Sequence, residues 1–161
     1  MSFRTLQNKF KQPLYKDDLL NVLKNGLLTA VLYGILMGAL QYLFGVLSGF
    51  YFSIFIYGIA FFIVKKVKNS YYNYHILYPL LGVIFFLIGY IFYGATQYIF
   101  VIRELGFSFQ ALIMQVFQII RLFDLTIYIS FDMDAFNYLL DLLIFIFCVV
   151  YTYRNSKNNY Y

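Results

Sequence analysis

The densest group of polar side chains in this chain of 161 residues lies in the segment "FDMDAFNYLLD", Phe131 to Asp141. In a helix beginning near Asp134, the side chains of Asp134, Asn137 and Asp141 share one stripe, with Asp132 just outside it. Carboxylate and amide oxygens on the outer aqueous side can coordinate a hard cation or contact a basic peptide. The spacing is therefore compatible with a ligand site.

The same acids also fit a purely structural role. An aspartate before the first helical turn caps the helix and interacts favourably with its dipole. Asp141 lies about a turn and a half further along, where it can pair with an arginine on the same side. Both interpretations stay open for the possible ligand or ion-pair cluster, which comprises Asp132, Asp134, Asn137, Asp141, Arg103 and Arg121.

Groups that would support catalysis or a metal centre are scarce. His75 is the only histidine and lies among tyrosines at the start of an apolar run, so we expect it to be a membrane-interface residue. Cys148, the only cysteine, lies in an apolar run without a basic partner, which predicts inert packing. No phosphate loop or nucleophile elbow is present. We expect a protein that is not an enzyme and uses no metal or cofactor.

Composition identifies the environment in which these residues must be positioned. The chain is 63% apolar, 24% aromatic and 12% charged, whereas soluble domains are about 45–50% apolar and about 25% charged. The net charge is +5, but the basic residues flank apolar runs instead of forming one face, which argues against nucleic-acid binding. The sequence predicts a single membrane domain over residues 1–161, surrounded by membrane lipids.

The longest uncharged run extends from Gly26 to Val64, which is 39 residues. One helix of that length would extend about 58 Å, against a hydrocarbon core of about 30 Å. Two crossings fit if the chain reverses near the middle residue, Gly45. We therefore expect the segment "GVLSG", Gly45 to Gly49, to mark a tight turn.

Small residues recur every four positions in the first half of this run. Such a stripe allows another helix backbone to approach closely in lipid. The third apolar run supplies partners inside the chain, so the stripe does not require a second copy. The predicted packing residues, a glycine-zipper pattern, are Gly26, Ala30, Gly34, Gly38, Gly82 and Gly89.

The whole sequence predicts an all-α membrane protein with four transmembrane helices. Their expected ranges are about 24–44, 47–65, 76–101 and 135–153. A fifth, amphipathic helix is expected at about 107–128, with Gln110, Gln115, Gln118, Arg121 and Asp124 on its polar face. Its large moment favours a helix lying in the outer interface. A crossing helix, whose polar face the bundle interior shelters, stays open.

Charge asymmetry predicts how the four spans are oriented. With both ends of the chain in the cytoplasm, ten of the twelve basic residues lie inside, as the positive-inside rule requires. This topology, N-in and C-in, makes residues 1–22 a basic cytoplasmic amphipathic segment and residues 154–161 a polar cytoplasmic tail. The expected location is the bacterial inner membrane.

The hairpin and third span, "YGILMGALQYLFGVLSGFYFSIFIYGIAFFIVKKVKNS…YPLLGVIFFLIGY", resemble a pattern in small uncharacterised bacterial multi-span membrane proteins. Those proteins have a glycine-rich transmembrane hairpin that ends in a basic loop, followed by a short third span. The resemblance covers Tyr33 to Tyr90, where this chain has Phe and Tyr at several positions that are small in the pattern. It implies no activity and no site residues.

Two functions from different classes are compatible with these patterns. The first is a non-enzymatic inner-membrane protein that packs against a membrane-protein partner or itself, as an accessory subunit or an immunity or tolerance factor. The second is a small oligomeric transporter or channel, whose outer acidic cluster attracts a cation.

Overall fold

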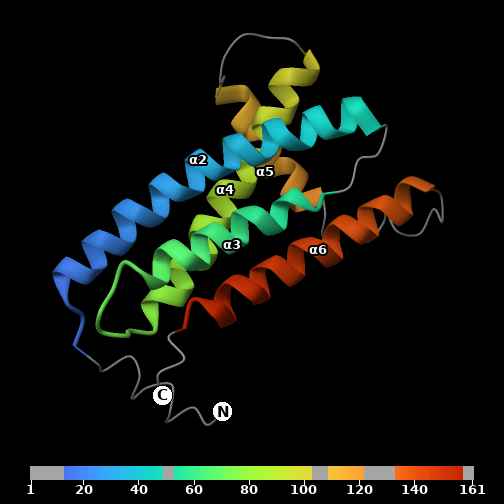
Figure 1. Cartoon of the computed structure of the whole chain (residues 1–161). Helices are drawn as coiled ribbons and strands as arrows, with labels where there is room; N and C mark the ends of the chain where they lie inside the picture. Colours follow the sequence, from blue (N-terminus) through green and yellow to red (C-terminus); the bar gives the residue numbers. More distant parts are fainter. Residues whose placement is uncertain (1–12, 49–52, 103–108, 122–132, 158–161) are drawn as a thin grey trace.

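The computed structural model of the chain describes residues 13–48, 53–102, 109–121 and 133–157. Every regular element in these ranges is a helix, so the prediction of an all-α fold is confirmed for them (Figure 1). The five helices are α2 (Lys16–Ser48), α3 (Phe55–Lys68), α4 (Leu77–Ile102), α5 (Phe109–Arg121) and α6 (Met133–Asn155).

α2 corrects the predicted position of the first reversal. It begins at Lys16 and continues through Gly45, a buried helical residue, to Ser48. The prediction that Gly45 starts the turn is therefore wrong, and Gly49 lies outside the described residues. The length of the uncharged run indicates that the chain reverses, but it does not locate the reversal. α2 starts ten residues before that run, in a polar segment, and is about 50 Å long.

The remaining helices agree with the expected spans to different degrees. α4 and α6 match the predicted ranges 76–101 and 135–153 within two residues. α3 has 14 residues and begins at Phe55, eight residues later than expected, so its length is only about 21 Å. Two helices in the described ranges, Lys16–Ser48 and Leu77–Phe100, are long and apolar enough to cross a membrane.

α2 and α4 run in the same direction, and α3 and α6 run in the opposite one (Figure 1). At one end of the bundle, the start of α2, the α3–α4 connection and the end of α6 come together. There the Asn73 N–H donates to Asp18 Oδ2 (3.1 Å) and the Tyr71 hydroxyl donates to the Ser156 carbonyl (2.7 Å). We call this end the basic end, because Lys65 and Lys66 lie exposed beside it in the last turn of α3.

The small residues of α2 pack against α4. A β-carbon on Gly34 would lie 2.5 Å from the Gly89 carbonyl oxygen, and one on Gly38 would lie 2.5 Å from the Tyr93 carbonyl oxygen. Gly26 lies against the Phe85 ring, and Ala30 is fully buried. Gly82 does not face α2; it packs on Ser156 at the end of α6. Only glycine permits such close contact between backbones.

The outward face of α2 is a row of exposed leucines. Leu28 and Leu32 each keep 55% of their surface exposed, and Leu43 keeps 54%. A water-soluble monomer rarely exposes a contiguous apolar patch larger than a few hundred Å². The exposed leucines and the buried glycines therefore fit a helix with lipid on one side and protein on the other.

α5 doubles back beside the second half of α4 (Figure 1). Its apolar side chains Met114 and Phe117 are exposed, whereas Gln115 is 6% exposed and packs on Gly94 of α4. This arrangement is closer to the alternative in which the bundle shelters the polar face. The rest of the predicted range 107–128 lies outside the described residues.

Candidate functional site

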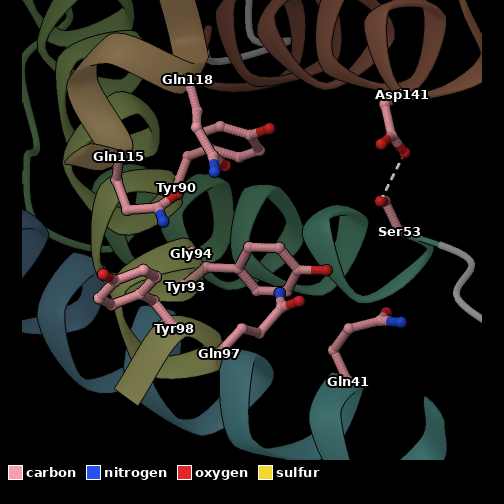
Figure 2. A pocket seen from close by; sticks show the side chains of 10 residues that line it. All are labelled: Gln41, Ser53, Tyr90, Tyr93, Gly94, Gln97, Tyr98, Gln115, Gln118 and Asp141. Carbon is pink, nitrogen blue, oxygen red and sulfur yellow. Dashed lines mark hydrogen bonds between the residues drawn. The ribbon is translucent and has the colours of Figure 1, made fainter. Parts of the chain in front are cut away.

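A polar cavity of about 320 Å³ lies between the helices (Figure 2). Its lining residues outside α4 and α5 come from the last turns of α2, the turn before α3 and the first half of α6, away from the basic end. α4 contributes Tyr90, Tyr93, Gly94, Gln97 and Tyr98 to its lining. The remaining lining residues come from the other segments and are Gln41, Ser53, Gln115, Gln118 and Asp141. Cavities in proteins that bind small molecules are about 300–1,000 Å³, so this volume suits a small ligand.

Asp141 is the only charged side chain among the lining residues that the structure describes. It is half-buried and lies eight residues after the start of α6, which is about 12 Å along the helix axis. The Ser53 hydroxyl donates a hydrogen bond to Asp141 Oδ1 at 2.5 Å. Ser53 lies in the turn just before α3, so the bond connects two segments that are 88 residues apart in the chain.

Two deeply buried polar atoms in the lining have no hydrogen-bond partner among the described residues. Gln41 is 2% exposed and its Oε1 accepts no hydrogen bond. Tyr93 is 4% exposed, and its hydroxyl lies near Gln97 and Ser53 without the geometry of a hydrogen bond. Figure 2 shows the Tyr93 hydroxyl pointing toward the space between Ser53 and Gln41.

Side chains from α5 form another part of the cavity wall. A β-carbon on Gly94 would collide with the Gln115 side chain, so glycine at this position lets the amide lie directly on α4. Gln118, one turn further along α5, is exposed. Because one lining residue is exposed while Gln41 and Tyr93 are buried, the cavity reaches from the surface of the described structure into its interior.

Within the described ranges the lining has one carboxylate and no lysine, arginine or histidine. An ionised carboxylate between walls of low dielectric constant produces a negative potential that water screens only in part. Tyr90 and Tyr93 stack with their ring centroids 6.0 Å apart and present aromatic faces beside this charge. The arrangement can therefore bind a positively charged group and can hold water in its absence.

The structure brings one residue of the predicted cluster into this cavity. Asp141 is bonded there to Ser53, and the lining residues that the structure describes include no arginine. Asp134 and Asn137 lie in the first turns of α6, and Arg121 is the last residue of α5. The structure does not describe the side chains of these three residues. Asp132 and Arg103 lie outside the described residues. The described part of the chain contains no group of three or more His, Cys, Asp or Glu that could hold a metal ion.

The two residues considered for chemistry, His75 and Cys148, are both buried away from this cavity. His75 is 4% exposed, with Nδ1 accepting the Leu77 N–H at 3.2 Å. Cys148 is fully buried in the core.

The sequence patterns do not predict this cavity. Gln41, Ser53 and Gln97 each stand alone in an apolar run and are too few to indicate a site by count. They do share a similar predicted depth in the membrane, because each lies a few residues from the outer end of its predicted span. Asp141 lies at a similar depth in the last predicted span. The tyrosines carried no separate signal, because tyrosine is abundant throughout the chain.

Comparisons with protein families, curated proteins and solved structures give no match. The resemblance of Tyr33 to Tyr90 to small bacterial multi-span membrane proteins therefore stays a prediction.

Proposed function

We propose that this chain is a non-enzymatic four-span protein of the bacterial inner membrane that binds a small cation in its polar cavity. In this proposal it acts as a small transporter or channel subunit, with both ends of the chain in the cytoplasm. The observation that carries the proposal is the position of Asp141. Among the described lining residues its carboxylate is the one charged group, beside four glutamines and three tyrosines.

The position of the cavity supports binding from the outer side. Lys65, Lys66 and Lys68 end α3 at the basic end of the bundle, where the positive-inside rule places the cytoplasm. Gln41 and Asp141 lie toward the other end. The cavity therefore belongs to the outer half of the bundle.

The short α3 fits a hydrated cavity at this depth. Its helical bonds begin at Phe55, so Ser53 and Ile54 form a turn beside the cavity. Non-helical backbone within a membrane is tolerated where protein covers it or where it lines a water-filled space. A cavity beside this turn supplies such a space.

Packing against a partner has less support than cation binding. That function depended on the small-residue stripe of α2, and α4 covers Gly34 and Gly38 within the same chain. The stripe is consequently not available to another protein while α2 and α4 stay together. We therefore retain cation binding as the proposed function.

Charge-selective labelling tests the proposal. A Gln97→Cys variant in a Cys148→Ala background places one thiol in the cavity. Spheroplasts are treated with membrane-impermeant methanethiosulfonates, one cationic and one anionic. We expect the cationic reagent to react at least about tenfold faster, since a focused field of this kind raises association rates by about 10–10³.

Two further variants serve as controls for this experiment. Adding Asp141→Asn should abolish the preference between the two reagents while labelling continues. Ile84→Cys, at a half-exposed apolar position of α4, should stay unlabelled because lipid covers it. Equal rates for the two reagents at Gln97→Cys, or no labelling there, would contradict the proposal.

A further inference from the structure

We propose that the cation is a protonated primary amine, whose ammonium group is held jointly by Asp141, Gln41 and Tyr93. This inference rests on the proposed function, because it names the chemical class that the same cavity selects. Its basis is a match between three available acceptors in the cavity and the three donors of an ammonium group.

The first acceptor is the free oxygen of the Asp141 carboxylate. Ser53 donates to Oδ1, and no hydrogen bond from the described residues reaches Oδ2. The Ser53 bond also fixes the orientation of the carboxylate, since it anchors one oxygen to the start of α3. An ionised carboxylate can accept about four hydrogen bonds, so this one has capacity to spare.

The other two acceptors are the buried atoms without partners, Gln41 Oε1 and the Tyr93 hydroxyl oxygen. Gln41 approaches from α2 and Tyr93 from α4, while Asp141 approaches from α6. Buried polar atoms are almost always hydrogen-bonded, and leaving one unsatisfied is unfavourable. Two such atoms in the cavity that Asp141 also lines therefore indicate a ligand that donates in several directions.

A primary ammonium group has this property. It carries one positive charge and three N–H donors and has no acceptor. Its charge would balance the one charge among the described lining residues, and its donors would satisfy the three oxygens. A quaternary ammonium ion could interact with the tyrosine rings, but it has no N–H and would leave the three acceptors without donors.

Metal cations fit the cavity less well. Calcium takes six to eight oxygen ligands and usually several carboxylates, whereas the described lining residues supply one carboxylate. A volume of about 320 Å³ also greatly exceeds that of a bare ion. The additional volume, flanked by the rings of Tyr90 and Tyr98, suits the carbon chain of an organic amine.

Binding to the full-length protein in lipid nanodiscs tests this inference. The probe is n-butylammonium chloride, compared with tetramethylammonium chloride, sodium chloride and neutral 1-butanol. Heats of binding and the rise in unfolding temperature report occupancy, because a ligand that binds only the folded state stabilises it. We expect saturable butylammonium binding, at least about tenfold weaker tetramethylammonium and sodium binding, and no 1-butanol binding.

Near-isosteric variants identify the three acceptors. Asp141→Asn should weaken butylammonium binding at least about tenfold, since it removes the charge but keeps an oxygen for Ser53 to bond. Gln41→Met and Tyr93→Phe should each weaken binding about fivefold. Tyr33→Phe is the matched control, because Tyr33 stacks on Phe62 outside the cavity, and it should bind like the wild type.

The outcomes separate the inference from the proposed function. If sodium or tetramethylammonium binds as tightly as butylammonium while Gln97→Cys still prefers the cationic reagent, the primary-amine inference is wrong and the proposed function stands. Butylammonium binding that none of the three acceptor variants weakens also overturns the inference. If no cation binds and the labelling shows no charge preference, both are wrong.

Discussion

The carbonyl oxygen of Gly89 lies 2.5 Å from the point that a β-carbon on Gly34 would occupy. α2 and α4 therefore meet through their backbones at this level, and the atom in the way belongs to the main chain. A flexible side chain could rotate away from an added methyl group, whereas a helical carbonyl can move only with its helix. The close approach of these two helices consequently depends on glycine at position 34.

Gly34→Ala should reduce the free energy of unfolding by about 1–3 kcal/mol, which is the usual cost of overpacking. The greater helix propensity of alanine offsets at most about 1 kcal/mol of this cost. Reversible unfolding in mixed detergent micelles measures the change. Leu36→Ala, at a position 48% exposed on the same helix, is the control and should change stability much less. Equal effects of the two variants would contradict the backbone contact.

Ser53→Ala should destabilise the junction between α3 and α6. It removes the hydroxyl that donates to Asp141, and a net loss of about 1–2 kcal/mol is expected for a partly solvated bond to a charged group. Ser53→Thr keeps the hydroxyl and should retain most of that stability. The same unfolding assay applies, and identical losses for alanine and threonine would show that the hydrogen bond contributes nothing.

How far the sequence predicts this structure differs between its helices. The spacing of small residues depends only on the periodicity of one helix, so it can be read from the sequence. Gly34 and Gly38 lie on the face of α2 that packs against α4. Length counting was sufficient to indicate a reversal after Gly26. It could not distinguish Gly45 in a buried helix from glycine in a turn, because both environments favour the same residue.

The candidate site was harder to predict because it depends on contacts between distant segments. Asp141 stands out in the sequence for its depth in the predicted span, and an ion pair with an arginine is one of the roles open to it. The hydrogen bond that the structure describes for its carboxylate comes from Ser53, 88 residues earlier, while Arg103 and the Arg121 side chain lie outside the described part of the chain. No local pattern connects these two positions, since their encounter requires α3 and α6 to run side by side. The same holds for Gln115, whose contact with Gly94 buries one residue of the predicted polar face of α5 against α4.

Gly94→Ala should alter the cavity more than the stability of the fold. The added β-carbon would meet the Gln115 side chain, which is flexible and can move into the cavity. We expect cationic labelling of Gln97→Cys to slow at least about threefold. Gln115→Ala in the same chain should restore the wild-type rate because it removes the displaced amide. A double variant as slow as Gly94→Ala alone would exclude this mechanism.

Ser156→Ala should leave stability unchanged or increase it. The Ser156 side-chain oxygen is buried without a hydrogen-bond partner among the described residues, and it lies 2.9 Å from the point that a β-carbon on Gly82 would occupy. Removing an unsatisfied buried hydroxyl eliminates its desolvation penalty, about 1–3 kcal/mol. The Tyr71 bond persists, since it uses the Ser156 backbone carbonyl.

Thr152→Val is the matched comparison for this prediction. The Thr152 hydroxyl is buried too, but it donates to the Cys148 carbonyl at 2.7 Å. Its loss should lower the unfolding temperature, whereas Ser156→Ala should not. If both variants were destabilising by the same amount, the Ser156 hydroxyl would have a hydrogen-bond partner under the conditions of the assay.

The orientation of α5 can be tested with a thiol reagent too large to enter the cavity, such as a polyethylene-glycol maleimide. In a Cys148→Ala background, Gln118→Cys should react from the outer side because position 118 is exposed, whereas Gln115→Cys should resist modification because position 115 is 6% exposed against α4. A helix lying in the interface with its polar face toward water would present both positions to the reagent. Comparable modification rates at positions 115 and 118 would therefore favour the interfacial helix expected from the sequence. A modification rate at least about tenfold lower at position 115 than at position 118 would favour an α5 whose polar face forms one wall of the cavity.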